Sequence, residues 1–165
     1  MSTSNITLRP VGPDDHEFIL TIYASTRADE MALVPWTDEQ REGFVRWQFT
    51  AQQEHYAKHY PSGNHDVILS DGRQVGRLFV ARLDDEIRIV DITLLPAERN
   101  AGIGSYLVQQ LLDEADRTRK VTRIYVEEFN PSLNLFKRLG FSPSDQSGIY
   151  LLMQRNPTQQ LRSDG

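Results

Sequence analysis

The segment that most constrains this chain is a strand that runs into a glycine turn and from there into a helix. Residues 87–95 are rich in β-branched side chains and apolar on both faces, as in a central strand. Pro96 ends the strand, residues 99–104 (RNAGIG) form the turn, and residues 105–117 carry apolar side chains at helical spacing. The first N–H groups of a helix have no intrahelical acceptor, and the helix dipole adds positive charge there. The segment therefore predicts a binding site for an anion such as a pyrophosphate.

The turn by itself admits three interpretations. Gly102 and Gly104 would let phosphate oxygens reach the backbone, because a Cβ would hold them away. The same residues would also occur at a helix start that only needs flexible residues. They would occur as well in a generic α/β domain that binds another phosphate ligand. A Rossmann dinucleotide site is disfavoured, because no third glycine follows at the required spacing. A Walker A loop does not fit either, because Ser105 and Tyr106 follow Gly104 where lysine and serine or threonine are needed.

Two helices are predicted before the first hairpin. Residues 6–9 alternate as a strand, and Asp14 and Asp15 can cap a helix that follows. Thr37, with Gln40 three residues later, resembles a capping box in front of a helix over residues 38–59. Several side chains recur on one side of this helix at three- and four-residue steps. They are Phe44, Trp47, Gln48, Ala51, His55 and His59.

The second half of the chain alternates strands and helices. Strands over residues 67–69, 74–82 and 87–95, joined by Asp-Gly and Asp-Asp turns, read as a meander. A strand over residues 121–126, a short helix that ends at Gly140 and a strand over residues 149–153 follow. Long helical runs in a sheet-rich chain predict an α/β or α+β domain.

Length and composition bound the kind of protein. The 165 residues fit one domain, expected over residues 1–155, with a polar, flexible tail over residues 156–165. No apolar run approaches the roughly 20 residues that span a bilayer, and the first residues lack a secretory pattern, so no membrane partner is expected. The absence of cysteine excludes disulfides and a cysteine nucleophile and agrees with a cytoplasmic location. The net charge of −5 disfavours nucleic acid and slightly favours cationic or neutral acceptors.

Two blocks of the sequence resemble the acetyl-CoA motif of the GNAT N-acetyltransferase superfamily. The first is Leu94-Leu95-Pro96 followed by Arg-x-x-Gly-x-Gly over residues 99–104. The second is residues 130–141 (NPSLNLFKRLGF), which is similar to the family's Asn-x-x-Ala…Leu-Tyr-x-x-x-Gly-Phe segment. The two blocks have the family's order and separation. The resemblance implies a GNAT-like mixed, mainly antiparallel central sheet with helices on both faces. It also implies acetyl-CoA as co-substrate, and it allows a homodimer.

The resemblance also implies which residues meet the co-substrate. The backbone of Leu94 is expected to pair with the pantetheine arm and to leave an N–H near the thioester carbonyl, as an oxyanion donor. The glycine turn is expected around the pyrophosphate, and Asn130 is expected to hydrogen-bond the pantetheine. Arg138 is expected near the phosphates, although an arginine that is only a solvated charge on a helix would show the same sequence pattern. The implied set is Leu94, Leu95, Arg99, Asn100, Ala101, Gly102, Ile103, Gly104, Ser105, Asn130, Phe136 and Arg138.

The sequence departs from the family at the usual proton donor. The tyrosine of Leu-Tyr-x-x-x-Gly-Phe, which protonates the departing thiolate, is Phe136 in this chain. A positioned acid typically contributes 10² to 10⁴ in rate. A thiol with a pKa near 8.5 nevertheless leaves as thiolate at pH 7 at a cost of only about 2 kcal/mol, and water can reprotonate it. Slower or acid-independent transfer is therefore expected, and loss of transfer with retained acyl-CoA binding is the rival interpretation.

A general base is needed because an amine of lysine type arrives protonated. Candidates are expected where the strands over residues 87–95 and 121–126 separate. Asp91 lies inside an apolar strand, where burial would raise the pKa of its carboxyl, but it could equally bond to backbone or to Arg88. Glu127 and Glu128 end the next strand and could bind the amine or pass on its proton, or be exposed strand-end charges. Asp91, Glu127 and the Leu94 N–H are the predicted catalytic groups.

The acceptor site is the least determined part of the sequence. Aromatic and acidic side chains suit a cationic amine, and they could equally be packing residues of the long helix. The predicted acceptor contacts are Glu30, Trp36, Gln52, Tyr56 and Glu127. No metal is expected, because His55 and His59 would need further ligands that the sequence does not offer.

Together these patterns predict an enzyme. It is expected to be an acetyl-CoA-dependent N-acetyltransferase that acetylates a primary amine of a small molecule or peptide by direct attack. The alternative is a non-catalytic acyl-CoA-binding or sensing module, and release of free thiol in the presence of amines distinguishes the two.

Overall fold

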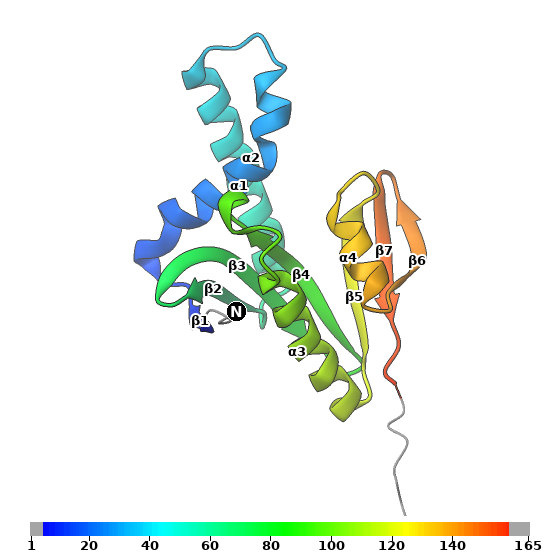
Figure 1. Ribbon diagram of the computed structural model, residues 1–165. Helices are drawn as coiled ribbons and strands as arrows, with labels where there is room; N and C mark the ends of the chain where they lie inside the picture. Colours follow the sequence, from blue (N-terminus) through cyan, green and yellow to red (C-terminus); the bar gives the residue numbers. More distant parts are fainter. Residues whose placement is uncertain (1–4, 159–165) are drawn as a thin grey trace, which may run out of the picture. The chain divides into compact units, whose positions relative to one another are not determined.

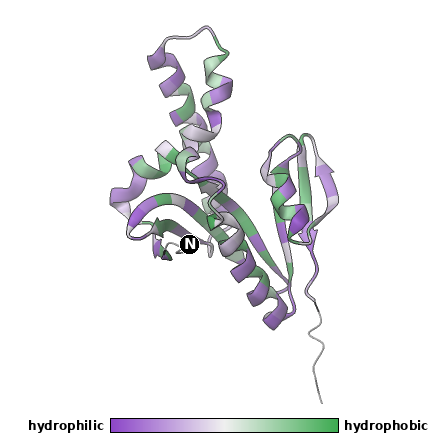
Figure 2. Ribbon diagram, in the orientation of Figure 1, coloured by the Kyte–Doolittle hydropathy of each residue, from purple (hydrophilic) through white to green (hydrophobic). Residues whose placement is uncertain are grey.

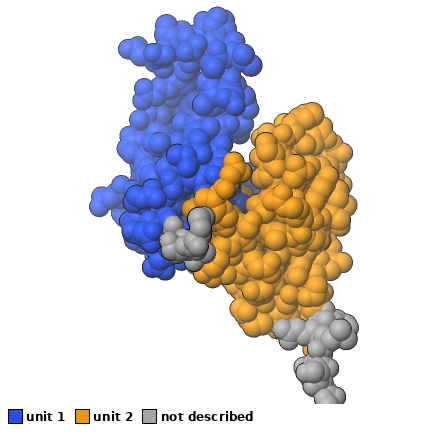
Figure 3. Space-filling view, in the orientation of Figure 1, with its two compact units in different colours: residues 1–79, 92–99 blue, residues 80–91, 100–165 orange. Residues whose placement is uncertain are grey.

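The computed structural model describes residues 5–158, which form two compact units (Figure 3). Unit 1 comprises Met1–Phe79 and Ile92–Arg99, and unit 2 comprises Val80–Asp91 and Asn100–Gly165. The helices (Figure 1) are α1 (His16–Ala32), α2 (Asp38–His59), α3 (Ile103–Thr118) and α4 (Ser132–Arg138). The strands are β1 (Ile6–Pro10), β2 (Asn64–Ser70), β3 (Arg73–Arg82), β4 (Glu86–Leu94), β5 (Val121–Glu127), β6 (Ser142–Ser147) and β7 (Tyr150–Arg155).

The fold is a mixed α/β fold built on one seven-stranded sheet. The strand order is β1-β2-β3-β4-β5-β7-β6. The β1–β2, β5–β7 and β6–β7 pairs are antiparallel, and the β4–β5 pair is parallel, with α3 as its crossover. The prediction of a mixed, mainly antiparallel sheet is therefore confirmed.

Unit 1 buries one face of a helical pair against the sheet. Ile19 and Tyr23 of α1 pack with Val45 and Phe49 of α2 and with Val67 of β2. The predicted capping box is present: Gln40 N–H donates to the Thr37 hydroxyl, and Thr37 N–H donates to the Gln40 side chain. The predicted bounds of α2 are also those observed.

The side of α2 that meets the core differs from the one the sequence spacing picked out. Val45 and Phe49 are buried, whereas Trp47 is 67% exposed and His55 and His59 are exposed. Polar residues interrupt every stripe of this helix, so periodicity could not distinguish the two sides. Only the packing of α1 and the sheet selects the buried stripe.

A buried carboxylate ties the start of the chain to the first helix. Asp15 accepts two hydrogen bonds from the Arg9 guanidinium, at 2.8 and 3.1 Å, and one from the Gly12 N–H at 2.7 Å. The Arg9 hydrogen bonds and then the Gly12 hydrogen bond lower the pKa of the Asp15 carboxyl from 3.8 to about 2. Asp15 occupies the N-cap position of α1, as predicted, but its side chain does not cap that helix; it accepts from the Gly12 N–H instead and closes the short 3-10 turn Pro13–Asp15.

Asp15→Asn is expected to remove a pH-dependent contribution to stability. Because the carboxyl has a lower pKa in the folded chain, its contribution is fully present above about pH 4 and is lost as the pH falls toward 2. The difference in melting temperature between the wild type and Asp15→Asn should therefore be largest near neutral pH and should shrink between pH 4 and pH 2. Thermal unfolding over this range measures it, with the exposed neighbour Asp14→Asn as control. A difference that is constant with pH would contradict the prediction.

Unit 2 is organised around α3 and β5. The buried residues of α3 are Leu107, Val108, Leu111, Leu112 and Ala115, a continuous stripe as predicted. On β5, Thr122, Ile124 and Val126 are buried, whereas Arg123, Tyr125 and Glu127 are half-buried or exposed on the other side.

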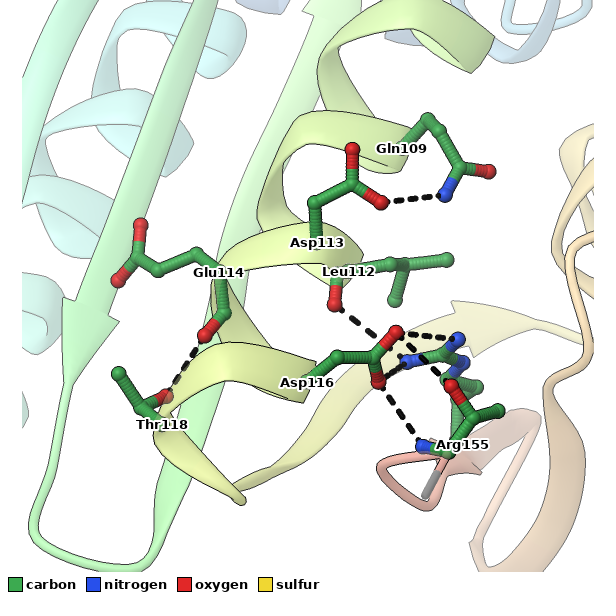
Figure 4. A network of polar contacts seen from close by, with 8 residues as sticks. Gln109, Leu112, Asp113, Glu114, Asp116, Thr118 and Arg155 are labelled. Atoms are coloured by element: carbon green, nitrogen blue, oxygen red, sulfur yellow. Dashed lines mark hydrogen bonds and ion pairs between the residues drawn. The ribbon is translucent and has the colours of Figure 1, made fainter. Parts of the chain in front are cut away.

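An ion pair fixes the end of β7 to α3. The guanidinium of Arg155 donates to the Asp116 carboxylate at 2.6 Å, and the Thr158 N–H donates to the same group at 2.9 Å (Figure 4). Burial alone would raise the pKa of the Asp116 carboxyl, but the hydrogen bonds from Arg155 and Thr158 lower it below its usual value. The predicted tail begins within this contact, and its residues 159–165 lie outside the described residues.

The sequence patterns missed one strand. β6, with the sequence SPSDQS, is exposed along its whole length and carries no alternation, and Figure 2 shows it in hydrophilic shades. Its pairing with β7 is interrupted by an irregularity between Pro143 and Asp145. A polar, bulged strand of this kind is typical of a protected sheet edge, which offers no hydrophobic signal to detect.

Candidate active site

The end of β4 is held against β3 within unit 1. The Leu95 N–H donates to the Val75 carbonyl at 2.9 Å. At Gly76, an added Cβ would overlap the Thr93 carbonyl oxygen and would lie 2.9 Å from the Leu94 side chain. Only glycine fits at this contact, so the approach of the two backbones determines where the predicted oxyanion donor, the Leu94 N–H, lies.

The turn after β4 has the backbone conformations that its sequence indicated. The Arg99 side chain folds back, and its Nε donates to the Leu94 carbonyl at 3.2 Å. Asn100 and Gly102 follow with φ angles of +64° and +83°, in the left-handed region. Ala101 is exposed between them. Asparagine and glycine are the residues that adopt such angles most readily, so the local sequence accounts for the turn.

The start of α3 presents backbone donors without a side-chain cap. Gly102 is the N-cap and has no side chain to accept a hydrogen bond, and the first intrahelical bond runs from the Tyr106 N–H to the Gly102 carbonyl at 3.0 Å. A Cβ added at Gly102 would meet nothing within 4 Å, so the space beside the turn is open. The N–H groups of Ile103, Gly104 and Ser105 come before the Tyr106 N–H, which is the first to have an intrahelical acceptor. This arrangement is suited to a phosphate group.

The two sequence blocks meet in unit 2. A Cβ at Gly104 would lie 3.7 Å from the side chain of Leu135 in α4. Phe136, the next residue, is 2% exposed and packs edge-to-face on Phe141 with ring centroids 5.3 Å apart. Arg138 is exposed at the end of α4. Candidate cofactor contacts from the glycine turn and from α4 therefore belong to neighbouring helices.

The two candidate bases lie toward the ends of adjacent strands. The β4–β5 ladder runs over four pairs, from Glu86–Val121 to Ile89–Ile124. Asp91 follows on β4, and Glu127 ends β5, opposite Tyr150 of β7. Both carboxylates are half-buried, and each takes part in a polar or electrostatic interaction.

Asn130 lies directly after Glu127 and Glu128. Its N–H donates to the Glu127 carbonyl at 2.9 Å, and its side-chain oxygen accepts from the Ser132 N–H at 2.9 Å. The amide oxygen of Asn130 therefore orders the start of α4, and the NH₂ group is the only hydrogen-bond donor of this side chain.

The predicted acceptor residues in unit 1 do not form one cluster. The Gln52 side chain accepts from the Arg77 guanidinium at 2.6 Å, and Tyr56 packs edge-to-face on Phe79 of β3. Trp36 packs on Phe44 near the N-terminus of α2, and Glu30 pairs with Arg27 on α1. Gln52 and Tyr56 thus share the side of α2 that faces β3, while Trp36 and Glu30 lie toward the connection between α1 and α2.

Gly76 is a site residue that the sequence patterns did not single out. A glycine inside an apolar strand is a signal for a bulge or for a close backbone approach. Its partner could not be known before strand pairing placed it against Thr93 and Leu94.

Two further features of the described chain bear on the predictions. Within residues 5–158, no three or more histidine and carboxylate side chains are grouped so as to hold a metal ion. Among the helices described, none combines the length and the apolar character needed to cross a bilayer.

The fold places an uncapped helix start directly after a central strand, an arrangement suited to a phosphate group. The sequence profile described as the acetyltransferase (GNAT) family matches residues 29–141, more than half of the chain. The chain therefore belongs to the acetyltransferase (GNAT) family, as its two motifs suggested. No curated protein matches the sequence significantly.

Solved structures with the same fold cover nearly the whole chain. The PaiA N-acetyltransferase of Thermoplasma acidophilum, in complex with coenzyme A, has a TM-score of 0.70 at 15% identity and covers 92% of this chain and 99% of its own. A GNAT family acetyltransferase of Elizabethkingia anophelis with acetyl-CoA bound has a TM-score of 0.61 at 15% identity, with 92% and 98% covered. A structure described as a candidate phosphinothricin N-acetyltransferase has a TM-score of 0.61 at 25% identity, with 94% and 100% covered.

Proposed function

We propose that this protein transfers the acetyl group of acetyl-CoA to a primary amine. The observation that carries the proposal is the open, uncapped start of α3 behind Gly102, in a chain that belongs to the acetyltransferase (GNAT) family. Two structures with this fold contain coenzyme A or acetyl-CoA, which supports the same ligand here.

Coenzyme A would be bound chiefly by backbone groups. The N–H groups at the start of α3 would hold the pyrophosphate, with the guanidinium of Arg99 beside the same turn. The backbone of Leu94 would pair with the pantetheine arm, with Leu95 following it. The NH₂ group of Asn130 would donate to the pantetheine, and Phe136 would contribute an apolar wall. Arg138, which is exposed on α4, would contact the phosphates from solvent.

The acetyl thioester supplies an activated acyl carbon, and the protein would position groups around it. The Leu94 N–H would donate to the carbonyl oxygen, where negative charge builds as the amine nitrogen bonds to the acyl carbon and the carbon–sulfur bond breaks. Asp91 or Glu127 would first accept a proton from the ammonium group, since an amine with a pKa near 10.4 arrives protonated. The attacking nitrogen would lose its second proton to water as the amide forms. Phe136 has no proton to donate, so water would protonate the departing thiolate.

A release assay tests this function directly. Purified protein is incubated with acetyl-CoA and a panel of primary amines, and free thiol is measured. Amine-dependent thiol release is the expected result.

The buried phenyl ring of Phe136 favours a second function, an acyl-CoA-binding module without transfer. Binding of acetyl-CoA by calorimetry without thiol release for any amine would establish that second function.

Phe136→Tyr is expected to raise the rate of transfer at neutral pH. It would restore a hydroxyl to a position beside the proposed cofactor site, and we expect kcat to rise on the order of tenfold, the low end for general acid catalysis. Phe141→Tyr adds a hydroxyl to the ring that packs on Phe136 and is equally buried, so it controls for packing. If Phe136→Tyr gives no gain with a working acceptor, the leaving group needs no acid from this position.

A further inference from the structure

The carbonyl group of Leu94 points to the edge of β4 that faces away from β3. Two neighbouring backbone groups establish this direction. The Thr93 carbonyl oxygen faces Gly76 of β3, and the Leu95 N–H donates to the Val75 carbonyl at 2.9 Å. Because successive residues of a strand direct their N–H and carbonyl groups to opposite edges, both groups of Leu94 point the other way. The Leu94 carbonyl is thus directed to the edge along which the pantetheine arm is proposed to pair.

A side chain of the following turn already bonds to this carbonyl. The Arg99 Nε donates to the Leu94 carbonyl oxygen at 3.2 Å. A chain that pairs with β4 would lie about 4.8 Å away and would aim an N–H at the same oxygen. The guanidinium of Arg99 therefore stands where the pantetheine arm would run, and the arm can pair with Leu94 once this side chain has moved.

The backbone of the turn is anchored, and the Arg99 side chain is exposed. The carboxylate of Glu98 accepts from the guanidinium of Arg73 on β3, at 3.2 and 3.3 Å. The Arg99 N–H donates to the Pro96 carbonyl at 3.3 Å. The side chain of Arg99 lies at the surface, where water can replace its bond to Leu94. It can therefore rotate away while the backbone of the turn keeps its position.

Coenzyme A offers this guanidinium a stronger partner than the carbonyl. Hydrogen bonds between a guanidinium and a phosphate are stronger than those to a neutral oxygen. Arg99 directly precedes the left-handed residues Asn100 and Gly102, beside which the pyrophosphate is proposed to bind.

We infer that Arg99 is a specificity-determining residue for the acetyl donor. It occupies the Leu94 carbonyl until a pyrophosphate draws the guanidinium away, so the protein favours thioesters of coenzyme A over pantetheine thioesters that lack a pyrophosphate. This inference rests on the proposed function and concerns the choice of donor at the same site.

Two acetyl donors separate this role from a simple phosphate contact. Calorimetric titrations are made with acetyl-CoA and with S-acetylpantetheine, which has the same thioester arm and no phosphate. Arg99→Ala should weaken the binding of acetyl-CoA on the order of tenfold, because a cation beside the pyrophosphate is lost. The same variant should bind acetylpantetheine about threefold more tightly than the wild type does, the size expected for one exposed hydrogen bond. With a working amine, kcat/KM for the two donors should change in the same two directions.

Inorganic pyrophosphate provides a second measurement on the unaltered protein. At matched ionic strength, pyrophosphate should draw Arg99 from Leu94 and raise the affinity of the wild type for acetylpantetheine about threefold. Arg99→Ala should show no such increase, because its Leu94 carbonyl is already open.

Arg73→Ala is the matched control. It also removes an exposed arginine that bonds to this turn, but its partner is the Glu98 carboxylate. This variant should not bind acetylpantetheine more tightly than the wild type does. An equal gain in Arg73→Ala and Arg99→Ala would mean that loosening of the turn is the cause, and would overturn the inference.

The titrations also distinguish this inference from the proposed function. If Arg99→Ala binds acetylpantetheine no more tightly in a protein that binds and uses acetyl-CoA, the inference fails and the proposed function stands. Tighter binding of acetylpantetheine by Arg99→Ala, in a protein that releases no thiol with any amine, would support the inference and refute acetyl transfer. A wild-type protein that binds neither donor would refute the proposed site and the inference with it.

Discussion

Gly102→Glu is expected to abolish the binding of acetyl-CoA, with Kd raised at least about 100-fold, which corresponds to about 2.7 kcal/mol. Gly102 is the N-cap of α3 at a φ of +83°, and the space where a side chain would lie is open. A glutamate there would put a negative charge in the proposed pyrophosphate position and would oppose the N–H groups of the first turn. Calorimetric titration with acetyl-CoA measures the loss.

Gly72→Glu separates this effect from backbone strain. Gly72 lies in the turn between β2 and β3 at a φ of +82°, and an added Cβ there would also meet nothing within 4 Å. The two substitutions therefore impose the same strain and the same charge, in different places. Loss of binding in Gly102→Glu with normal binding in Gly72→Glu is the expected pattern. A folded Gly102→Glu variant that still binds acetyl-CoA with the affinity of the wild type would show that the pyrophosphate lies elsewhere.

Gly76→Ala is expected to lower kcat by about 10- to 100-fold while the protein still binds acetyl-CoA. The new methyl group would overlap the Thr93 carbonyl oxygen and press on Leu94, so the end of β4 must shift. The Leu94 N–H is the proposed oxyanion donor, and removal of one such donor typically costs 10² to 10³ in kcat, so a displacement should cost part of that. Steady-state rates of thiol release and calorimetric titration measure the two quantities.

Gly63→Ala is the matched control for packing. A Cβ at Gly63 would overlap the ring of Phe79, so this variant is also crowded within unit 1, but away from β4. Both variants should lose stability by a similar amount, on the order of 1–3 kcal/mol. If Gly63→Ala lowers kcat as much as Gly76→Ala does, the loss reflects general destabilisation and the position of Leu94 has no special role.

Much of the element order followed from local signals. The capping box of Thr37 and Gln40 predicted the start of α2, and the glycine turn predicted the approach to α3, which begins two residues earlier than its apolar stripe suggested. These signals involve residues three or four apart, so they need no knowledge of the rest of the chain. The polar strand β6 has no such signal, and its pairing with β7 was found only in the structure.

The family motifs made the candidate site predictable from the sequence, but not the roles of its individual residues. The order of the Leu94–Gly104 and Asn130–Phe141 blocks indicated the fold and the co-substrate, and the family match bears out that assignment. The roles of Asp91, Glu127 and Leu94 stay predictions, because chemistry depends on distances that spacing along a chain does not contain.

The sequence by itself determined the features that depend on a few consecutive residues: the left-handed turn at Asn100 and Gly102, the helix that follows it, and the absence of a hydroxyl at Phe136. Tertiary structure alone decided that Gly76 abuts Leu94 and that the Glu128 N–H pairs with the Ile149 carbonyl. The physical reason is the range of the interactions. Backbone angles and caps are set by neighbours in sequence, whereas strand pairing brings together residues about 20 positions apart, and its register follows from the packing of the whole sheet.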